Sequence, residues 1–176
     1  DAHTPFERTE MINSAAKPAV VITTVKLSED FSALFTDRIS VNLNTLSLDE
    51  KLPELDFSQA VSGTDSNYII YTSGTTGVPK GVEVSHDNLV TFTNWMNNDF
   101  NKIENNQILS QALYSFDLSI FSLYPSLTTG GTLVSLSRDE TTNFKLLFER
   151  LNSTVINTWI STPSFVDICL LDPSFT

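Results

Sequence analysis

The sequence has 176 residues, of which 40% are apolar and 18% are charged. A chain of this length can bury a hydrophobic core, and the composition excludes a disordered, collagen-like or coiled-coil protein. Ten basic and 21 acidic residues give a net charge of −11. The phosphates of nucleic acids and anionic membranes repel such a chain, so we expect no nucleic-acid partner. No apolar run approaches the ~20 residues that cross a bilayer, so we expect no membrane insertion.

The first half of the chain gives weak signals for secondary structure. We predict a helix over Pro5–Ser14, with Thr4 as its N-cap, because proline is favoured at the first helical position. The β-branched run Ala19–Val25 predicts a buried strand. Residues 28–63 are less regular: Ile39–Leu43 alternates like a strand, and much of the remainder is polar and typical of a linker.

The second half alternates short apolar runs with amphipathic segments. Strands are predicted over residues 68–72, 82–84, 108–111, 132–136 and 155–160, and helices over 86–99, 118–127, 143–152 and from Thr162-Pro163 onward. In the third of these helices the apolar side chains at 144, 147, 148 and 151 share one face. Alternation of strands and helices indicates βαβ units, so the predicted fold is α/β, with a mainly parallel sheet flanked by helices.

One loop concentrates groups that bind phosphate. It runs over residues 71–81, Tyr-Thr-Ser-Gly-Thr-Thr-Gly-Val-Pro-Lys-Gly, and holds three of the six glycines of the chain. Glycines let the backbone approach a ligand closely, hydroxyl groups donate to phosphate oxygens, and a lysine adds a positive charge. The loop matches neither G-x-x-x-x-G-K-[ST] nor G-x-G-x-x-G. The alternative interpretation is a surface turn rich in small residues.

The order of residues in this loop resembles the signature of the adenylate-forming superfamily, Y-T-S-G-[ST]-T-G-x-P-K-G, at every position that the signature specifies. The stretch Val82–His86 is also similar to that superfamily, although His86 alone is more typical of a surface or packing residue. The resemblance implies that the loop binds the β- and γ-phosphates of ATP, with Mg²⁺ on the phosphates and no protein metal ligand in this chain. The implied ATP-binding residues are Thr72, Ser73, Gly74, Thr75, Thr76, Gly77 and Lys80.

A second motif, Phe116-Asp117-Leu118-Ser119, points to the substrate. By its position alone, Asp117 is predicted to cap a helix. In the superfamily, F-D-x-S at this distance marks members that activate amino acids, and its aspartate binds the substrate ammonium group. A partly buried carboxylate is the natural counter-ion for a buried ammonium group. Asp117 therefore favours an amino acid over a fatty or aromatic acid.

The stretch 157–173, together with residues 116–119, 123–127 and 130–133, resembles the branch of the superfamily that activates D-alanine and loads it onto a carrier protein. The opening residues Asp1, Pro5, Glu7 and Arg8 are also similar to this branch. The resemblance implies that Cys169 lines the D-alanine pocket. The alternative is that Cys169 is a buried, inert thiol that acts as a small hydrophobic residue. Trp159 and Phe165 are interpreted as core residues.

The resemblance implies a two-step reaction: D-alanine and ATP give D-alanyl-AMP, and the phosphopantetheine thiol of a D-alanyl carrier protein then takes the alanyl group, for lipoteichoic acid D-alanylation. No signal peptide is visible, and ATP is required, so we expect a cytoplasmic protein. Since later superfamily motifs do not occur before Thr176, we expect 1–176 to be one central segment of a large N-terminal adenylation domain, without a complete catalytic site. Two alternatives stay open: an adenylation domain of a peptide synthetase, and a non-catalytic nucleotide-binding module.

Overall fold

The computed structural model describes residues 4–47, 54, 56–74, 77–100 and 104–175. The chain forms two compact units. The first unit comprises residues 1–61 and 71–82, and the second comprises residues 62–70 and 83–176. In the described ranges, no helix is both long enough and apolar enough to cross a membrane.

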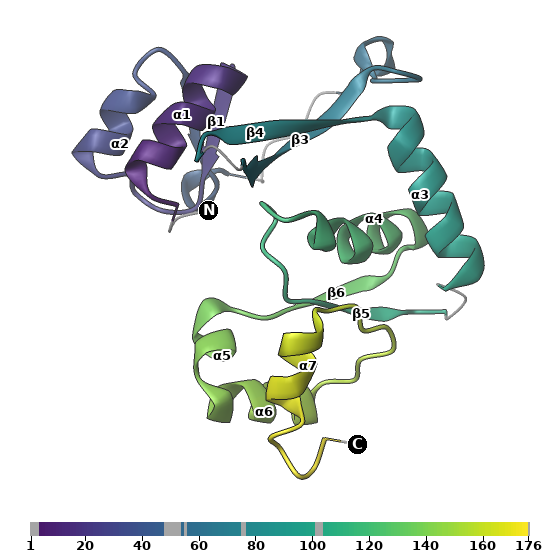
Figure 1. Ribbon diagram of the computed structural model, residues 1–176. Helices are drawn as coiled ribbons and strands as arrows, with labels where there is room; N and C mark the ends of the chain where they lie inside the picture. Colours follow the sequence, from purple (N-terminus) through teal and green to yellow (C-terminus); the bar gives the residue numbers. More distant parts are fainter. Residues whose placement is uncertain (1–3, 48–53, 55, 75–76, 101–103, 176) are drawn as a thin grey trace. The chain divides into compact units, whose positions relative to one another are not determined.

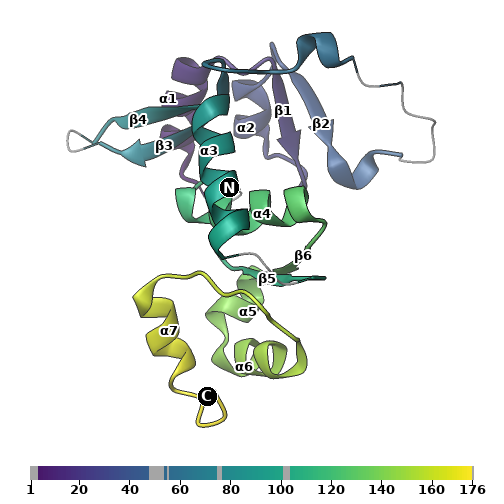
Figure 2. The same ribbon diagram turned by 90° about the vertical axis from the view of Figure 1, so that its right-hand side faces the viewer.

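The first unit begins with a helix, which is followed by a βαβ arrangement. Helix α1 (Phe6–Ala16) precedes β1 (Val20–Thr23), and helix α2 (Glu29–Leu34) connects β1 to β2 (Ile39–Asn42). The two strands lie side by side in Figure 2. They pair in parallel, from Val20 opposite Ile39 to Thr23 opposite Asn42. Two short 3₁₀ helices follow, η1 (Leu43–Thr45) and η2 (Phe57–Gln59). Both predicted strands form, over the middle of 19–25 and the first four residues of 39–43. The prediction that the first of them is buried is wrong, because Val20 is 45% exposed and Ile22 is 65% exposed.

Two details of the first unit differ from the sequence predictions. Pro5, not Thr4, is the N-cap of α1, and no side chain caps this helix. Pro5 has a ψ of 147°, far from the helical value, so the helix begins at Phe6, one residue later than predicted. Helix α2 was not predicted; it is capped by the Ser28 hydroxyl, which accepts from the backbone N–H of Phe31 at 3.5 Å. Six residues are too few for a clear helical period in the sequence.

Strands β3 (Ser66–Ser73) and β4 (Pro79–Ser85) form a two-stranded sheet. Only residues 74–78 link them, and a parallel pair needs a connection of a dozen or more residues, so the two strands run antiparallel. The predicted strands 68–72 and 82–84 are confirmed within these longer elements. The end of the pair nearer the link belongs to the first unit, and the other end belongs to the second.

The second unit is built around a parallel pair of strands. Helix α3 (His86–Asp99) leads to β5 (Gln107–Ser110), and β5 pairs in parallel with β6 (Thr132–Ser135). The connection between them contains η3 (Asp117–Ser119) and α4 (Ile120–Thr129). Three helices follow β6: α5 (Arg138–Thr142), α6 (Phe144–Ser153) and α7 (Pro163–Cys169). In Figure 1, α4 covers one face of the β5–β6 pair, and α6 and α7 lie on the other.

The two faces of β5 carry different side chains. Leu109 packs into the core on the side of α6 and α7, together with Val134, Leu147, Phe165 and Cys169. Successive strand residues point to opposite faces, so Ser110 faces α4. There its hydroxyl accepts a hydrogen bond from Ser122 Oγ at 3.3 Å, and both side chains are buried.

Small and polar residues line the inner side of α4. Ser126 Oγ donates to the carbonyl oxygen of Ser122 at 2.7 Å, and Ser119, Ser122 and Ser126 are all buried. The hydroxyl groups of Ser122 and Ser126 bond to neighbouring serines, and that of Ser119 donates to the carbonyl oxygen of Phe116, so the helix can lie close to the strands. Gly130 ends α4 in the left-handed region, with φ of 69°, which glycine adopts without strain.

The predicted strand 155–160 is wrong. Only one parallel bridge forms there, between Ile108 and Thr158. The side chain of Asn157 accepts the N–H of Gln107 at 3.0 Å, so a backbone carbonyl cannot take it. The backbone N–H groups of Asn157 and Thr158 both donate to the carbonyl oxygen of Gln107, at 2.8 and 3.1 Å. These bonds end the ladder after a single bridge.

The α/β fold class is confirmed: of the three strand pairs formed by the described residues, β1–β2 and β5–β6 are parallel. The strands lie in separate pairs rather than in one continuous sheet. The predicted helix 86–99 is confirmed in full, and the predicted helices 118–127 and 143–152 correspond to η3 with α4 and to α6. Helix α5, which was not predicted, begins with a capping box of Ser137 and Glu140.

Candidate functional site

The predicted phosphate-binding loop begins where β3 ends, and α1 holds this end of the strand. Arg8 Nη2 donates a hydrogen bond to the carbonyl oxygen of Tyr71 at 3.0 Å, across 63 positions of sequence. Tyr71 immediately precedes the hydroxyl-bearing residues of the loop. A hydrogen bond from a charged donor is stronger than a neutral one, so Arg8 fixes the point from which the loop departs.

Two glycines shape the loop. The N–H of Gly77 donates to the carbonyl oxygen of Gly74 at 3.0 Å, which closes a tight turn. Gly77 has φ of 80°, in the region that glycine favours. At Gly74, an added Cβ atom would collide with the carbonyl oxygen of Val78 and would lie 3.3 Å from Cγ of Lys80. Any larger residue at position 74 would therefore force the backbone or the lysine to move.

Lys80 and the hydroxyl residues of the loop are available to a ligand. Lys80 is exposed on β4 and makes no ion pair with any described residue. Thr72 and Ser73, at the end of β3, are also exposed. Thr75 and Thr76 lie outside the described residues. The described part of the loop thus offers two hydroxyl groups and one unpaired ammonium group, which can stabilise an anionic ligand.

Asp117 lies in the second unit, at the start of η3, and it does not cap a helix. The N-cap of η3 is Phe116, and no side chain caps either η3 or α4. Ser119 Oγ instead donates to the Phe116 carbonyl at 2.7 Å and closes the turn. The prediction of a helix-capping Asp117 is therefore wrong, and the residue is exposed.

The Asp117 carboxylate has one electrostatic neighbour of note. No described residue forms a hydrogen bond or an ion pair with it. Tyr68 of β3 lies near enough for the negative charge of Asp117 to act on its hydroxyl group. Burial raises the pKa of the Tyr68 hydroxyl, and the neighbouring Tyr124 and Asp117 raise that pKa further. The rings of Tyr68 and Tyr124 stack with centroids 6.5 Å apart. The carboxylate is thus open to a cationic group beside an aromatic pair.

Cys169 lies in the hydrophobic core, with no exposed surface. Burial raises the pKa of its thiol, so the neutral form is favoured. This environment is that of a small hydrophobic residue and differs from the exposed position of Asp117. Contact between Cys169 and an amino-acid side chain stays a prediction. Phe165 is buried, and Trp159 packs on the core with its ring centroid 5.8 Å from that of Phe165, so both core assignments are confirmed.

The described residues contain no group of three or more histidine, cysteine, aspartate or glutamate side chains that could hold a metal ion. His86 begins α3, directly after its N-cap Ser85, and is half-buried. Its ring nitrogen Nδ1 is buried and has no partner among the described residues. The sequence did not reveal that this nitrogen of His86 would lack a partner. Nor did it reveal Arg8 as the anchor of β3, because the hydrogen bond from Arg8 to Tyr71 joins two segments far apart in the sequence.

A family model described as "AMP-binding enzyme" matches residues 1–176, the whole chain. The chain belongs to the AMP-binding enzyme family. It is 89% identical over 176 residues to a D-alanine–D-alanyl carrier protein ligase of Lactococcus lactis subsp. lactis (strain IL1403). That match covers all of this chain and 35% of the relative, so the chain spans about a third of the length of the ligase.

Solved structures of AMP-binding enzymes share this fold. A four-domain nonribosomal peptide synthetase bound to AMP and glycine, holo-AB3403, has a TM-score of 0.74 and 28% identity; the match covers 99% of this chain and 12% of that one. An o-succinylbenzoate coenzyme A synthetase from Bacillus subtilis, in complex with ATP and magnesium, has a TM-score of 0.76 and 16% identity, over 96% of this chain and 34% of that one. At 16% identity the similarity is one of fold.

Proposed function

We propose that this chain is a central segment of the N-terminal adenylation domain of an ATP-dependent ligase that activates D-alanine and loads it onto a D-alanyl carrier protein. The observation that carries the proposal is the 89% identity, over all 176 residues, to a ligase of that name. Asp117 has a carboxylate that forms no ion pair with a described residue, and Lys80 of the phosphate loop is exposed. They supply the negative and positive charges that the reaction needs to hold an ammonium group and phosphates.

In the first step, a carboxylate oxygen of D-alanine attacks the α-phosphorus of ATP. The bond from that phosphorus to the oxygen bridging to the β-phosphate breaks, which gives D-alanyl-AMP and pyrophosphate. Lys80 and the hydroxyl groups of Ser73, Thr75 and Thr76 stabilise the charge that develops on the departing pyrophosphate. The family resemblance extends this role to Thr72, Gly74 and Gly77. Mg²⁺ would neutralise phosphate charge, and its protein ligand is expected outside this segment.

Asp117 holds the ammonium group of D-alanine, so that the carboxylate of the substrate faces the phosphorus. Its carboxylate is free for this role because no described residue pairs with it. The cation and the carboxylate lose water together when the substrate binds, and a charge-assisted hydrogen bond compensates that cost. Cys169 is proposed to border the methyl group of D-alanine, which requires the core around α7 to open toward the substrate.

In the second step, the phosphopantetheine thiolate of the carrier protein attacks the alanyl carbonyl, a thioester forms, and AMP leaves. The thioester would supply D-alanine for lipoteichoic acid. We place the protein in the cytoplasm, because it needs ATP.

The test is ATP–pyrophosphate exchange by the full-length ligase, with D-alanine, L-alanine, glycine and a fatty acid as substrates. We expect D-alanine to support the fastest exchange. Asp117→Asn should lower kcat/KM for D-alanine about 100-fold, because removal of one partner leaves a desolvated charge unpaired. Asp139→Asn on α5 is the matched control, since it removes one exposed negative charge from a residue outside the proposed site. Exchange with the fatty acid, unaffected by Asp117→Asn, would contradict the proposal.

A second candidate is amino-acid adenylation within a peptide synthetase. It is favoured by the 28% identity to the synthetase bound to AMP and glycine. Both candidates need Asp117, so the same assay separates them by substrate. Exchange that is fastest with glycine or an L-amino acid would favour the synthetase.

A further inference from the structure

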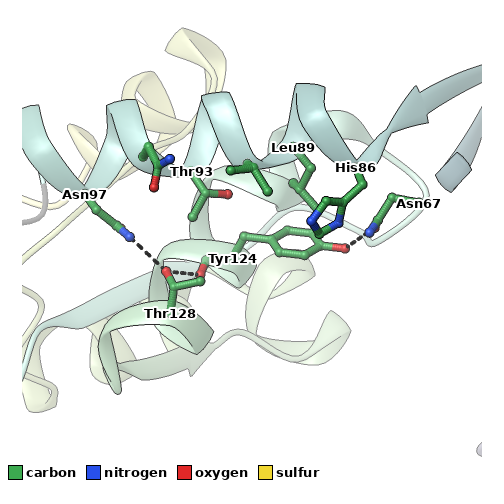
Figure 3. A pocket seen from close by; sticks show the side chains of 9 residues that line it. Asn67, His86, Leu89, Thr93, Asn97, Tyr124 and Thr128 are labelled. Atoms are coloured by element: carbon green, nitrogen blue, oxygen red, sulfur yellow. Dashed lines mark hydrogen bonds between the residues drawn. The ribbon is translucent and has the colours of Figure 1, made fainter. Parts of the chain in front are cut away.

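A pocket of about 430 Å³ lies between α3 and α4 in the second unit (Figure 3). Its polar lining includes Thr93 and Asn97 on α3, Tyr124 and Thr128 on α4, and His86 at the start of α3. Leu89 and Val90 add apolar surface. None of the described residues that line it is lysine, arginine, aspartate or glutamate. Its size lies within the usual range of small-molecule sites.

Three polar atoms of this lining are buried without a partner among the described residues. They are Thr93 Oγ1, Asn97 Oδ1 and His86 Nδ1. Thr93 is only 6% exposed, and its side chain extends into the space between the helices (Figure 3). More than nine in ten buried polar groups in proteins have a hydrogen-bond partner. Three such atoms around one cavity mark it as a place where a bound molecule would find hydrogen-bond partners.

The walls of the pocket are fixed by hydrogen bonds. Asn97 Nδ2 donates to Thr128 Oγ1 at 3.0 Å, and Thr128 Oγ1 donates to the carbonyl oxygen of Tyr124 at 2.8 Å. The Tyr124 hydroxyl donates to Asn67 Oδ1 at 3.2 Å. Because its amide nitrogen is engaged in this way, Asn97 presents its oxygen as an acceptor. Thr93 can both donate and accept, and His86 Nδ1 does either according to its tautomer.

We propose that this pocket binds a small uncharged molecule rich in hydroxyl groups, such as a polyol or a monosaccharide. A hydroxyl group both donates and accepts, which matches an acceptor at Asn97 and a group of either kind at Thr93. The absence of charged lining residues disfavours an ion. The carbon skeleton of such a molecule can lie against Leu89 and the ring of Tyr124. The site contains no residue of the phosphate loop, nor Asp117 or Cys169, so it is additional to the proposed ligase chemistry.

The test measures binding of glycerol, xylitol and glucose to the full-length protein by saturation-transfer NMR, in the absence of ATP and D-alanine. Acetate and ethylammonium serve as charged probes. We expect saturable binding of at least one hydroxylated probe. Thr93→Val should weaken it tenfold or more, because valine keeps the shape of threonine without its hydroxyl. Thr91→Val, on the exposed side of the same helix, is the matched control and should bind as the wild type does.

Thermal unfolding supplies the second measurement. If the Thr93 hydroxyl lacks a protein partner, Thr93→Val should leave Tm unchanged or raise it in the absence of probe. A fall in Tm would show that the full-length protein already satisfies this hydroxyl, and would overturn the proposal. Failure of all three hydroxylated probes to bind, equal weakening in Thr91→Val, or tighter binding of a charged probe would also overturn it. None of these outcomes depends on ligase activity, so the two proposals can fail separately.

Discussion

Arg8 on helix α1 donates a hydrogen bond to the carbonyl oxygen of Tyr71, at 3.0 Å, at the point where β3 passes into the phosphate loop. The bond ties a helix near the start of the chain to a loop more than 60 positions later. It acts on the backbone, so it constrains where the loop begins without using any of the groups that are proposed to touch phosphate.

The first prediction concerns this anchor. Arg8→Ala should raise the KM for ATP roughly fivefold with a smaller change in kcat, because the loss of about 1 kcal/mol of loop positioning weakens binding by that factor. Arg8→Lys should recover only part of the effect, since a single ammonium group lacks the planar donor geometry of arginine. Lys17→Ala, at the exposed C-cap of the same helix, should leave the KM unchanged. An equal effect of Lys17→Ala would show that net charge, rather than the anchor, is responsible.

The second prediction concerns the glycine beneath Lys80. Gly74→Ala should reduce ATP–pyrophosphate exchange by roughly 100-fold. The new methyl group would displace the loop backbone at Val78, and a displacement of about 1 Å in a catalytic site can lower the rate by about that factor. Circular dichroism should show an unchanged fold. Gly63→Ala is the control: its φ of 55° makes the substitution strained, but a Cβ atom there meets nothing within 4 Å. That variant should lose stability and keep its KM for ATP.

The third prediction concerns the capping box of α5. Hydrogen bonds from the backbone and hydroxyl of Ser137 lower the pKa of Glu140, and the charge of Arg150 lowers it slightly more. A carboxyl group whose pKa falls on folding stabilises the protein above its unfolded pKa, and this contribution disappears as the pH falls through the folded pKa. Glu140→Ala should therefore lower the urea midpoint at pH 7, and the difference from wild type should begin to shrink as the pH falls below the ordinary glutamate pKa of about 4.3 and should be smallest below the lowered pKa of Glu140. A difference that persists undiminished into acid would contradict the assignment.

The fourth prediction concerns the buried thiol. Since burial raises the pKa of Cys169, iodoacetamide should label it far more slowly in the native protein than in urea, as measured by peptide mass spectrometry. Cys169→Ser should lower the free energy of unfolding by about 1–3 kcal/mol, because a hydroxyl replaces the thiol in an apolar core. Cys169→Ala should cost less. If D-alanine meets this side chain, both variants should also change the ratio of D- to L-alanine activation.

Much of the fold could be predicted from local patterns. The apolar face of α6 appears in the structure as predicted, with Leu147 fully buried. The β-branched run at 20–23 forms a strand as predicted, but it is exposed rather than buried. One failure occurred where a single side chain changed the outcome. Asn157 looked like one residue of a strand, but its amide takes the hydrogen bond that would have extended the sheet. The hydropathy pattern does not show when a side chain takes the place of a backbone group as a hydrogen-bond partner.

The residues of the candidate site could be named from the sequence, but their exposure and burial could not be predicted as well. The residue order of the loop and the motif around Asp117 were visible in the sequence, because each concentrates unusual residues within a few positions. The exposure of Asp117 and the deep burial of Cys169 depend on tertiary packing, which composition does not encode. Thr93 was overlooked for a related reason: a threonine at a helical core position gives no sign that its hydroxyl will lack a partner.

Because serines lie on the inner side of α4, the position of that helix depends on the volume of the side chains there rather than on their polarity. Ser122 and Ser126 are buried where α4 approaches β5, and η3, which carries Asp117, runs directly into the same helix. Alanine in either place would keep the spacing, whereas valine or leucine would push the helix outward and carry the carboxylate with it. The position of a charged group at the surface is thus controlled by the steric volume of uncharged residues one and two turns away.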